Sequence, residues 1–369
     1  MTASSRDSRE LAVSVVVSTH NRQEDLRAAL RSLLHQVGGA SYEVLIVDNN
    51  SSDDTRAVVE GAMESSPVPL TYLFEPRQGV SYGRNAGILQ ARAPIIAITD
   101  DDCRPDPEWI ASIVRAFEKH PDVDCIGGRV VPAWPDDVPS WFTGLQAGPL
   151  AICDHGNEDR PVDAEHAALC LLTANLAVRR TAFEKVGMFS TEYPRGQDRE
   201  IQLRMWRAGC RGLYVPDLMV TVPIPPERLN KQYFRGWYRK YGKVHARLDL
   251  LDRLDRDGRL VTPPADSRLF GTSPHVYRSF LVSVLGWLWS AVRRREADGT
   301  YHENRICYFG NYIATSFKRA REAPQGSLPL QIARFLLWRL HYRVAPPRQT
   351  ANKPERGSPA SSSLSRGSP

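Results

Sequence analysis

The sequence predicts an α/β fold, with a doubly wound sheet in the amino-terminal half and a mainly helical region after it. Short apolar runs alternate with longer helix-patterned segments from residue 12 to about 129, as expected of βαβ units. The runs are apolar almost throughout, which is typical of parallel strands covered on both faces. A polar, turn-forming segment follows each run, where sheets of this kind bind ligands.

The elements of the amino-terminal half are predicted from the spacing of apolar residues. Strands are expected at 13–17, 44–47, 71–74 and 95–98. One helix is expected at 24–36, where leucines recur at helical spacing, and another at 107–120, which begins with a proline.

The rest of the chain divides by composition. Residues 130–168 are rich in Pro, Trp and Asp and predict loops. Regular structure is expected again over 171–215, including a strand run and helices at 181–186 and 198–208, the second ended by Gly209. Residues from about 228 to 340 predict helices, and the Pro/Ser/Arg-rich residues 345–369 predict a disordered tail.

Composition limits the classes of protein without choosing one. The formal charge of +6 suits an anionic ligand, an acidic membrane face or a nucleic acid. The six cysteines are dispersed without C-x-x-C spacing, so neither a zinc cluster nor a disulfide framework is indicated, and a reducing cytoplasm fits best. The polar amino end lacks a signal peptide, and the longest apolar run, 280–292, is too short to span a bilayer. We therefore expect a cytoplasmic protein, soluble or peripherally attached to a membrane.

The strongest local signal is the acidic run Asp100, Asp101 and Asp102 at the end of an apolar strand. Three adjacent carboxylates repel one another. A divalent cation offsets that repulsion, and Mg²⁺ or Mn²⁺ held by carboxylates and phosphate oxygens is a common way to bind a diphosphate. A solvated acidic turn that caps the next helix is the alternative.

Four further segments each allow a ligand-binding and a structural interpretation. Asp48 in VDNNSSDD could accept from a base or ribose, or close a local turn, and the STHNR segment could meet a nucleotide or start a helix. Arg84 in RQGVSYGRNAG could line the same rim or lie on the surface, because glycine-rich loops are nonspecific singly. Asp198 in RGQDRE stands at a helix start, where the helix dipole favours acidic residues in any case.

In series, these five segments resemble family-two glycosyltransferases of the GT-A fold. The matching segments are STHNR, VDNNSSD, GVSYGRNAG, the D-x-D-like acidic run and GQD before a helix, and the resemblance spans about 13–216. It implies a Rossmann-like nucleotide-binding half with a mixed central sheet. The implied domains are a catalytic domain at 10–222 (nucleotide-sugar half 12–129, acceptor half 130–222), a helical extension at 223–344 and the tail.

The resemblance also implies an inverting transfer from a nucleoside-diphosphate sugar, with a UDP-sugar favoured over a GDP- or dTDP-sugar. Asp198 would be the general base, and Asp102 would hold Mg²⁺ or Mn²⁺ together with Asp100. The implied donor-binding residues are Thr19, Asn21, Arg22, Asp48, Arg84, Asp100 and Asp101. On the acceptor side the candidates are Asn175, Gln197 and Glu200.

Two positions depart from the family pattern. Gln197 stands where the family usually has Glu, and Asn49 stands where a second Asp is frequent. Glu200 is an alternative base, although on a helix it would point about 200° away from Asp198.

The helical region leaves two alternatives open. Residues 222–243 resemble a stretch in some bacterial members in which a histidine often precedes P-P-E-R; that position is Val222 here. Its alternating basic and aromatic residues could bind a diphosphate-lipid acceptor or a membrane, or form a packed helix with a solvated basic face. The apolar residues 280–289 and the arginines 293–295 likewise predict either a membrane-surface helix or ordinary core.

Three other functions compete with sugar transfer. A nucleotidyltransferase should carry a Gly-rich, Lys- or Arg-bearing loop after the first strand, which STHNR lacks. A catalytically silent nucleotide- or glycan-binding relative would have no need of Asp198. A nucleic-acid binder is disfavoured because the basic residues are dispersed and no recognition motif is present. The acceptor could be a glycan, a lipid-linked sugar or a small molecule.

Overall fold

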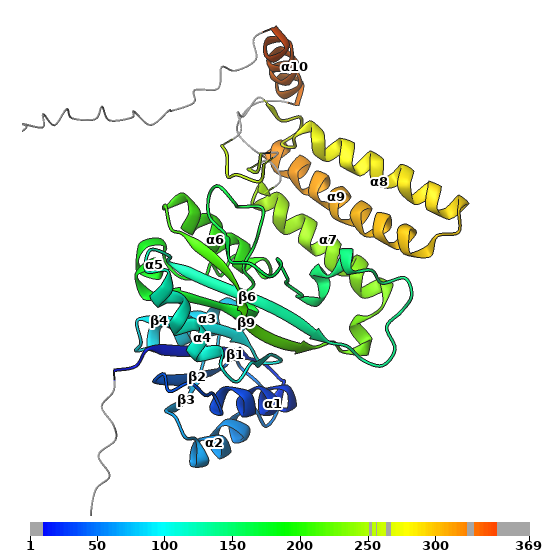
Figure 1. Ribbon diagram of the computed structural model, residues 1–369. Helices are drawn as coiled ribbons and strands as arrows, with labels where there is room; N and C mark the ends of the chain where they lie inside the picture. The colour runs from blue at the N-terminus through cyan, green and yellow to red at the C-terminus, as the bar shows by residue number, and fades with distance from the viewer. Residues whose placement is uncertain (1–9, 251–252, 256, 263–266, 323–327, 345–369) are drawn as a thin grey trace, which may run out of the picture.

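The computed structural model describes residues 10–250, 253–255, 257–262, 267–322 and 328–344. The predicted tail at 345–369 and the polar first nine residues lie outside the described residues. Figure 1 shows a sheet domain with a group of long helices packed on one side.

A mixed sheet forms the centre of the fold, with strand order β3-β2-β1-β4-β8-β6-β9-β5 and β7 paired to β9. The strands are β1 (Val13–Thr19), β2 (Tyr42–Asp48), β3 (Leu70–Phe74), β4 (Ile95–Asp100), β5 (Arg104–Pro105), β6 (Cys125–Ala133), β7 (Arg160–Pro161), β8 (Leu176–Arg179) and β9 (Gly212–Pro223). Strands β1 to β4 are parallel, whereas β8 runs antiparallel to β4 and β6. The four predicted strands and the mixed sheet are confirmed.

Helices cover both faces of this sheet, and a second group follows it. Those of the sheet domain are α1 (Gln23–Leu34), α2 (Thr55–Ser65), α3 (Val80–Gln90), α4 (Trp109–Lys119), α5 (Arg180–Val186) and α6 (Gln197–Arg207). Those of the carboxyl-terminal region are α7 (Lys231–Arg247), α8 (Pro274–Val292), α9 (Glu296–Glu322) and α10 (Leu328–Val344). The helical carboxyl-terminal region is confirmed (Figure 1). The predicted loop region 130–168 is mostly irregular, apart from the end of β6, the short β7 and two 3₁₀ turns.

Alternate residues of each strand belong to different cores. Val15 and Val17 pack with α1, α2 and α4, whereas Val16 packs with Ile88 of α3 and with α5 and α6. All three valines are fully buried. Burial on both faces explains why these strands read as continuous apolar runs, since each strand sits between two layers of helix.

The strand register brings the polar segments together. Thr19 pairs with Asp48 across β1 and β2, and Ser18 pairs with Asp100 across β1 and β4. The carboxyl ends of three strands therefore lie side by side, at the edge where ligands bind in such sheets.

The carboxyl-terminal helices are attached to the sheet domain through α7 and through a contact of α9 with Gln146. Helix α7 packs on α9, and α8 packs on the other side of α9 (Figure 1). His245 of α7 shares a 2.6 Å hydrogen bond with the hydroxyl of Tyr308, and Asn304 of α9 donates to the side chain of Gln146. None of the helices in the described ranges is both long and apolar enough to cross a bilayer.

Close packing of α3 on the sheet predicts a test of the fold. A Cβ added at Gly87 would lie 2.4 Å from Cγ1 of Val16 and 3.1 Å from Cγ2 of Val47. We expect Gly87→Ala to lower the free energy of unfolding by about 1–3 kcal/mol through overpacking, measured by urea denaturation.

Gly61 of α2 is the matched control, because a Cβ there meets nothing within 4 Å. Gly61→Ala should leave stability unchanged or raise it by up to about 1 kcal/mol, since alanine favours helix. Equal effects of the two substitutions would contradict the packing account.

Candidate functional site

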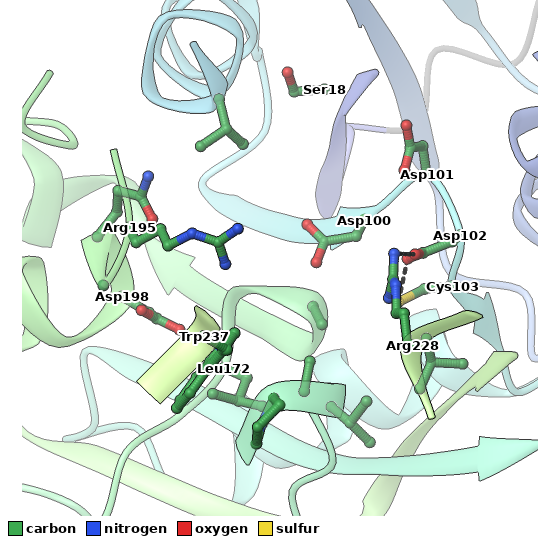
Figure 2. A pocket seen from close by; sticks show the side chains of 18 of the residues that line it. Ser18, Asp100, Asp101, Asp102, Cys103, Leu172, Arg195, Asp198, Arg228 and Trp237 are labelled. Carbon is green, nitrogen blue, oxygen red and sulfur yellow. Dashed lines mark hydrogen bonds and ion pairs between the residues drawn. The ribbon is translucent and has the colours of Figure 1, made fainter. Parts of the chain in front are cut away.

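A pocket of about 580 Å³ opens at the carboxyl ends of the parallel strands. The segments after β1, β2 and β4 line it together with α3, the start of α6 and α7. The pocket unites eight of the predicted site residues: Thr19, Arg22, Arg84, Asp100, Asp101, Asp102, Gln197 and Asp198. Figure 2 shows Asp198 and Arg195 on one side and Asp102, Cys103 and Arg228 on the other, with Asp100 between them.

Each carboxylate of the acidic run has a guanidinium partner. Arg84 donates to Asp100 at 2.8 Å. One nitrogen of Arg22 donates to Asp101 at 2.7 Å and to Asp102 at 2.9 Å. Because like charges this close are costly, these ion pairs are what allow three carboxylates to stand in one turn.

Asp101 holds the turn together. Its Oδ1 accepts from Arg22, and its Oδ2 accepts the Thr19 hydroxyl at 2.8 Å. Burial raises the pKa of Asp101 to about 6, although the charge of Arg22 opposes that rise. Both oxygens therefore accept hydrogen bonds from the protein itself, so Asp101 stabilises the turn that carries Asp100 and Asp102.

Asp100 and Asp102 are better placed to hold a cation. Their ligand atoms lie with that of Cys103 within 4.8 Å of one another. Within the described part of the chain, no hydrogen bond engages Asp100 Oδ2, and Asp102 Oδ1 has only a 3.9 Å contact from the Cys103 thiol. Two carboxylate oxygens suit Mg²⁺ or Mn²⁺. Burial raises the pKa of the Cys103 thiol well above its usual value, which makes it a poor ligand for such hard ions.

Asp198 lies in the first turn of α6, after Gly196, whose φ of 71° is readily adopted by glycine. Its side chain is partly exposed within the pocket wall. Burial raises the pKa of Asp198 above its ordinary value, while the charges of Arg84 and Arg199 oppose that rise. A carboxylate with a raised pKa is a stronger base than a fully solvated one.

Two predicted donor-binding residues lie beside the pocket without lining it. Asp48 accepts from the backbone N–H of Ser51 and from the hydroxyl of Tyr72, both at 2.8 Å. Asn21 accepts from the backbone N–H of Ser52 and takes a left-handed φ of 51°. Asn21 thus joins the loops after β1 and β2, whereas Asp48 joins the loop after β2 to β3.

Two predicted acceptor residues are bonded inside the protein. Asn175 is fully buried, donates to the carbonyls of Arg129 and Leu218, and accepts from the indole of Trp109. Glu200 forms an ion pair of 2.7 Å with Arg204 on its own helix. Neither residue lines the pocket, whereas Gln197 does.

The pocket also contains two arginines that were not predicted as site residues and part of the aromatic stretch 222–243, for which the sequence left acceptor binding as one alternative. Arg195 precedes the GQD segment, and Arg228 of the P-P-E-R stretch lies 3.6 Å from Asp102. Three aromatic residues of α7 form one wall: Tyr233, Trp237 and Tyr241. The rings of Trp237 and Tyr241 are stacked 4.2 Å apart. The basic and aromatic composition of 222–243 was the available signal, but it did not show which side chains face inward.

The chain is similar in sequence to known glycosyltransferases. The sequence model described as "Glycosyl transferase family 2" matches residues 14–187. Glycosyltransferase AglE of Haloferax volcanii is 29% identical over 246 residues, which make up 66% of this chain and 75% of that protein. Glucosyl-dolichyl phosphate glucuronosyltransferase of the same organism is 26% identical over 245 residues, 63% of this chain and 76% of that protein.

One solved structure extends the likeness to the fold. The mannosyltransferase PcManGT from Pyrobaculum calidifontis, in complex with GDP-Man and Mn²⁺, superposes with a TM-score of 0.51. It is 18% identical, and the match covers 91% of this chain and 81% of that one. At this identity the likeness establishes the shared fold.

The charge balance at Asp101 predicts a pH-dependent role for Arg22. With a pKa of about 6, Asp101 is ionised above that pH and mostly protonated well below it, and Arg22 stabilises the ionised form. We expect Arg22→Gln to lower the free energy of unfolding by about 2 kcal/mol at pH 8 and by less at pH 5. Urea denaturation at the two pH values measures the difference.

Arg27 of α1, the helix that begins directly after Arg22, is the control. Its pair with Glu24 spans 3.8 Å, and both side chains are largely exposed. Arg27→Gln should change stability little at either pH. A loss for Arg22→Gln that is the same at pH 5 and pH 8 would show that its partner does not titrate in this range.

Proposed function

The chain carries a family 2 glycosyltransferase domain of the GT-A fold, and from this premise we propose that it transfers a sugar, with inversion, from a nucleoside-diphosphate sugar to an acceptor hydroxyl. One observation carries the proposal. A partly exposed carboxylate, Asp198, lies across one pocket from the Asp100 and Asp102 pair (Figure 2). A base on one side of a pocket and a pair of carboxylates that could hold a cation on the other suit a displacement between them.

On the donor side, positive charge would bind the diphosphate. Arg195 lines the pocket on the same side as Asp198, and Arg228 lines it 3.6 Å from Asp102 of the acidic turn. Asp100 and Asp102 would hold Mg²⁺ or Mn²⁺, which supplies charge stabilisation for a departing diphosphate. Thr19, Asn21, Arg22, Asp48, Arg84 and Asp101 would support the nucleotide end, directly or through the loops they join. The choice among UDP-, GDP- and dTDP-sugars is a matter for donor screening.

On the acceptor side, Asp198 would act as the general base. Its carboxylate accepts the proton of the acceptor hydroxyl while that oxygen forms a bond to the anomeric carbon. The bond from this carbon to the diphosphate oxygen breaks, and the nucleoside diphosphate leaves with the bonding electrons. One displacement on the face opposite the leaving group inverts the anomeric configuration. The raised pKa of Asp198 brings it closer to the value that suits a general base near neutral pH.

The aromatic wall of α7 would receive the acceptor. The stacked rings of Trp237 and Tyr241 offer a flat apolar surface, and Gln197 offers a polar group beside Asp198. Such a site suits a glycan, a lipid-linked sugar or a small hydroxylated molecule. The resemblance to a protein named for a glucosyl-dolichyl phosphate substrate supports the lipid-linked choice among these. A cytoplasmic site of action is part of this proposal.

Removal of the base is the direct test. We expect Asp198→Asn to lower kcat by about 10³-fold and to leave donor affinity near the wild-type value, because the amide cannot accept the proton. Turnover would be followed as nucleoside diphosphate release across UDP-, GDP- and dTDP-sugars, and donor affinity by calorimetry.

Glu200→Gln is the matched control on the same helix. Glu200 is paired with Arg204 and does not line the pocket, so kcat should stay within a few-fold of wild type. Full activity of Asp198→Asn together with a large loss in Glu200→Gln would assign the base to Glu200. Nucleotide-sugar binding without any transfer or hydrolysis would favour a silent binding relative.

Removal of metal tests the other half of the proposal. Protein treated with EDTA should lose turnover and regain it with Mn²⁺ or Mg²⁺. Asp102→Asn should need at least about tenfold more Mn²⁺ for half-maximal rate, because one of two ligand carboxylates is neutralised.

Asp137→Asn serves as the control, since that aspartate is exposed and lies outside the pocket. Its Mn²⁺ requirement should match wild type. Full turnover of metal-free protein would remove the cation from the proposal and leave the arginines as the groups that neutralise the diphosphate.

A further inference from the structure

Helix α8 packs Val276 and Phe280 on its neighbours in its first two turns, but from Leu281 onward it buries small and polar groups and exposes large apolar ones. Ser283 and Ser290 are buried on the side that meets α9, where Arg305 donates to the Ser283 hydroxyl at 3.2 Å. Gly286 lies on the same contact, since a Cβ there would come within 2.3 Å of the His302 ring. This is the reverse of the usual arrangement for a surface helix, which turns its apolar side to the core.

The opposite side of α8 is an exposed apolar surface, which we call the α8 apolar face. It consists of Leu281, Val282, Leu285, Leu288, Trp289 and Val292, each between 50% and 77% exposed. Their spacing of three, four and seven residues places them along one side of the helix. In Figure 1, α8 lies at the outer edge of the molecule, with α9 between it and α7. An unpartnered apolar stripe of this length marks an interaction surface.

Positive charge flanks both ends of the α8 apolar face. Arg278 is exposed one turn before Leu281, and three consecutive arginines, 293–295, are exposed after Val292. The guanidinium of Arg293 lies 4.4 Å from the centre of the Trp289 ring. Within the described ranges, Arg278, Arg293 and Arg294 form no ion pair, and α8 contains no acidic residue.

We propose that the α8 apolar face docks on the surface of an anionic phospholipid bilayer, with the helix lying in the plane of the membrane. The six apolar side chains would enter the boundary between headgroups and acyl chains, and the arginines would meet lipid phosphates. The same helix is not apolar enough to cross a bilayer, which agrees with an in-plane position. This inference does not depend on the proposed sugar transfer.

A second copy of the chain fits the same face less well. A two-fold interface places the same surface of both partners together. Whether the two α8 helices pair parallel or antiparallel, the arginines at the ends of one helix would lie against arginines of the other. Helix α8 has no acidic residue to balance these charges. An anionic bilayer provides both the apolar layer and the missing negative charge.

Vesicle flotation of the full chain tests the proposal. We expect the wild type to float with vesicles of phosphatidylcholine mixed with phosphatidylglycerol and to do so less with phosphatidylcholine alone. The triple variant Leu281→Gln, Leu285→Gln, Leu288→Gln should lower the partition coefficient by at least about tenfold, because apolar surface drives the insertion. The double variant Arg293→Gln, Arg294→Gln should lower flotation on the mixed vesicles only.

Leu89→Gln is the matched control, because Leu89 is a 67% exposed leucine on α3, away from α8. It should float as the wild type does, and thermal unfolding by circular dichroism should show that all variants are folded. Wild-type flotation of the triple variant would overturn the proposal. A second result would also overturn it: the wild type sediments as a dimer and does not float, and the triple variant sediments as a monomer. Should the triple variant fail to fold, loss of lipid selectivity in the arginine variant decides the matter.

Discussion

Repulsion among the three carboxylates at the end of β4 is the constraint around which the site is arranged. The compensating charges come from three distant parts of the chain: Arg22 after β1, Arg84 in α3 and Arg228 after β9. Each ion pair therefore ties a different element to the same strand end. The acidic turn needs these arginines for its own stability. The same ion pairs hold the segments after β1 and β9, together with α3, against the end of β4, so the pocket walls meet there.

That constraint also separates the roles of three adjacent residues. Both carboxylate oxygens of Asp101 accept hydrogen bonds, from Thr19 and Arg22, and burial raises its pKa to about 6. Asp100 and Asp102 each keep one oxygen that can face a ligand. The middle carboxylate is therefore bonded inside the protein, whereas the outer two each keep an oxygen available toward the pocket, a difference that the letters D-D-D do not reveal.

Sequence reasoning succeeded where position along the chain determines position in space. Apolar runs predicted β1 to β4 because strands buried on both faces have no polar side to interrupt them. Parallel strands end at one edge of the sheet, so segments that follow them must meet, and Thr19, Arg84 and Asp102 do meet in one pocket. Asp198 was predicted from the family resemblance instead, and the start of α6 lines the same pocket.

Sequence reasoning was less successful for side chains whose role depends on their hydrogen-bond and ion-pair partners. Asn175 and Glu200 have the chemistry of binding residues, but carbonyls, an indole and a guanidinium engage their polar groups. Arg228 was missed because its role depends on a distant contact. Nothing in a local pattern shows that the loop after β9 returns to the end of β4, since that contact depends on long-range pairing of β9 with β5 and β6.

Helix α7 connects the pocket to the helical region, so the predicted boundary at 222–223 divides the sequence without dividing the site. One side of α7 supplies the aromatic wall of the pocket, including Trp237. Its other side packs on α9, and Gly242 permits this contact because a Cβ there would lie 2.2 Å from the backbone oxygen of Tyr308. The position of α8 is therefore fixed relative to the aromatic wall through α9 and α7. If α8 rests on a bilayer, the same packing sets how far the pocket stands from that surface.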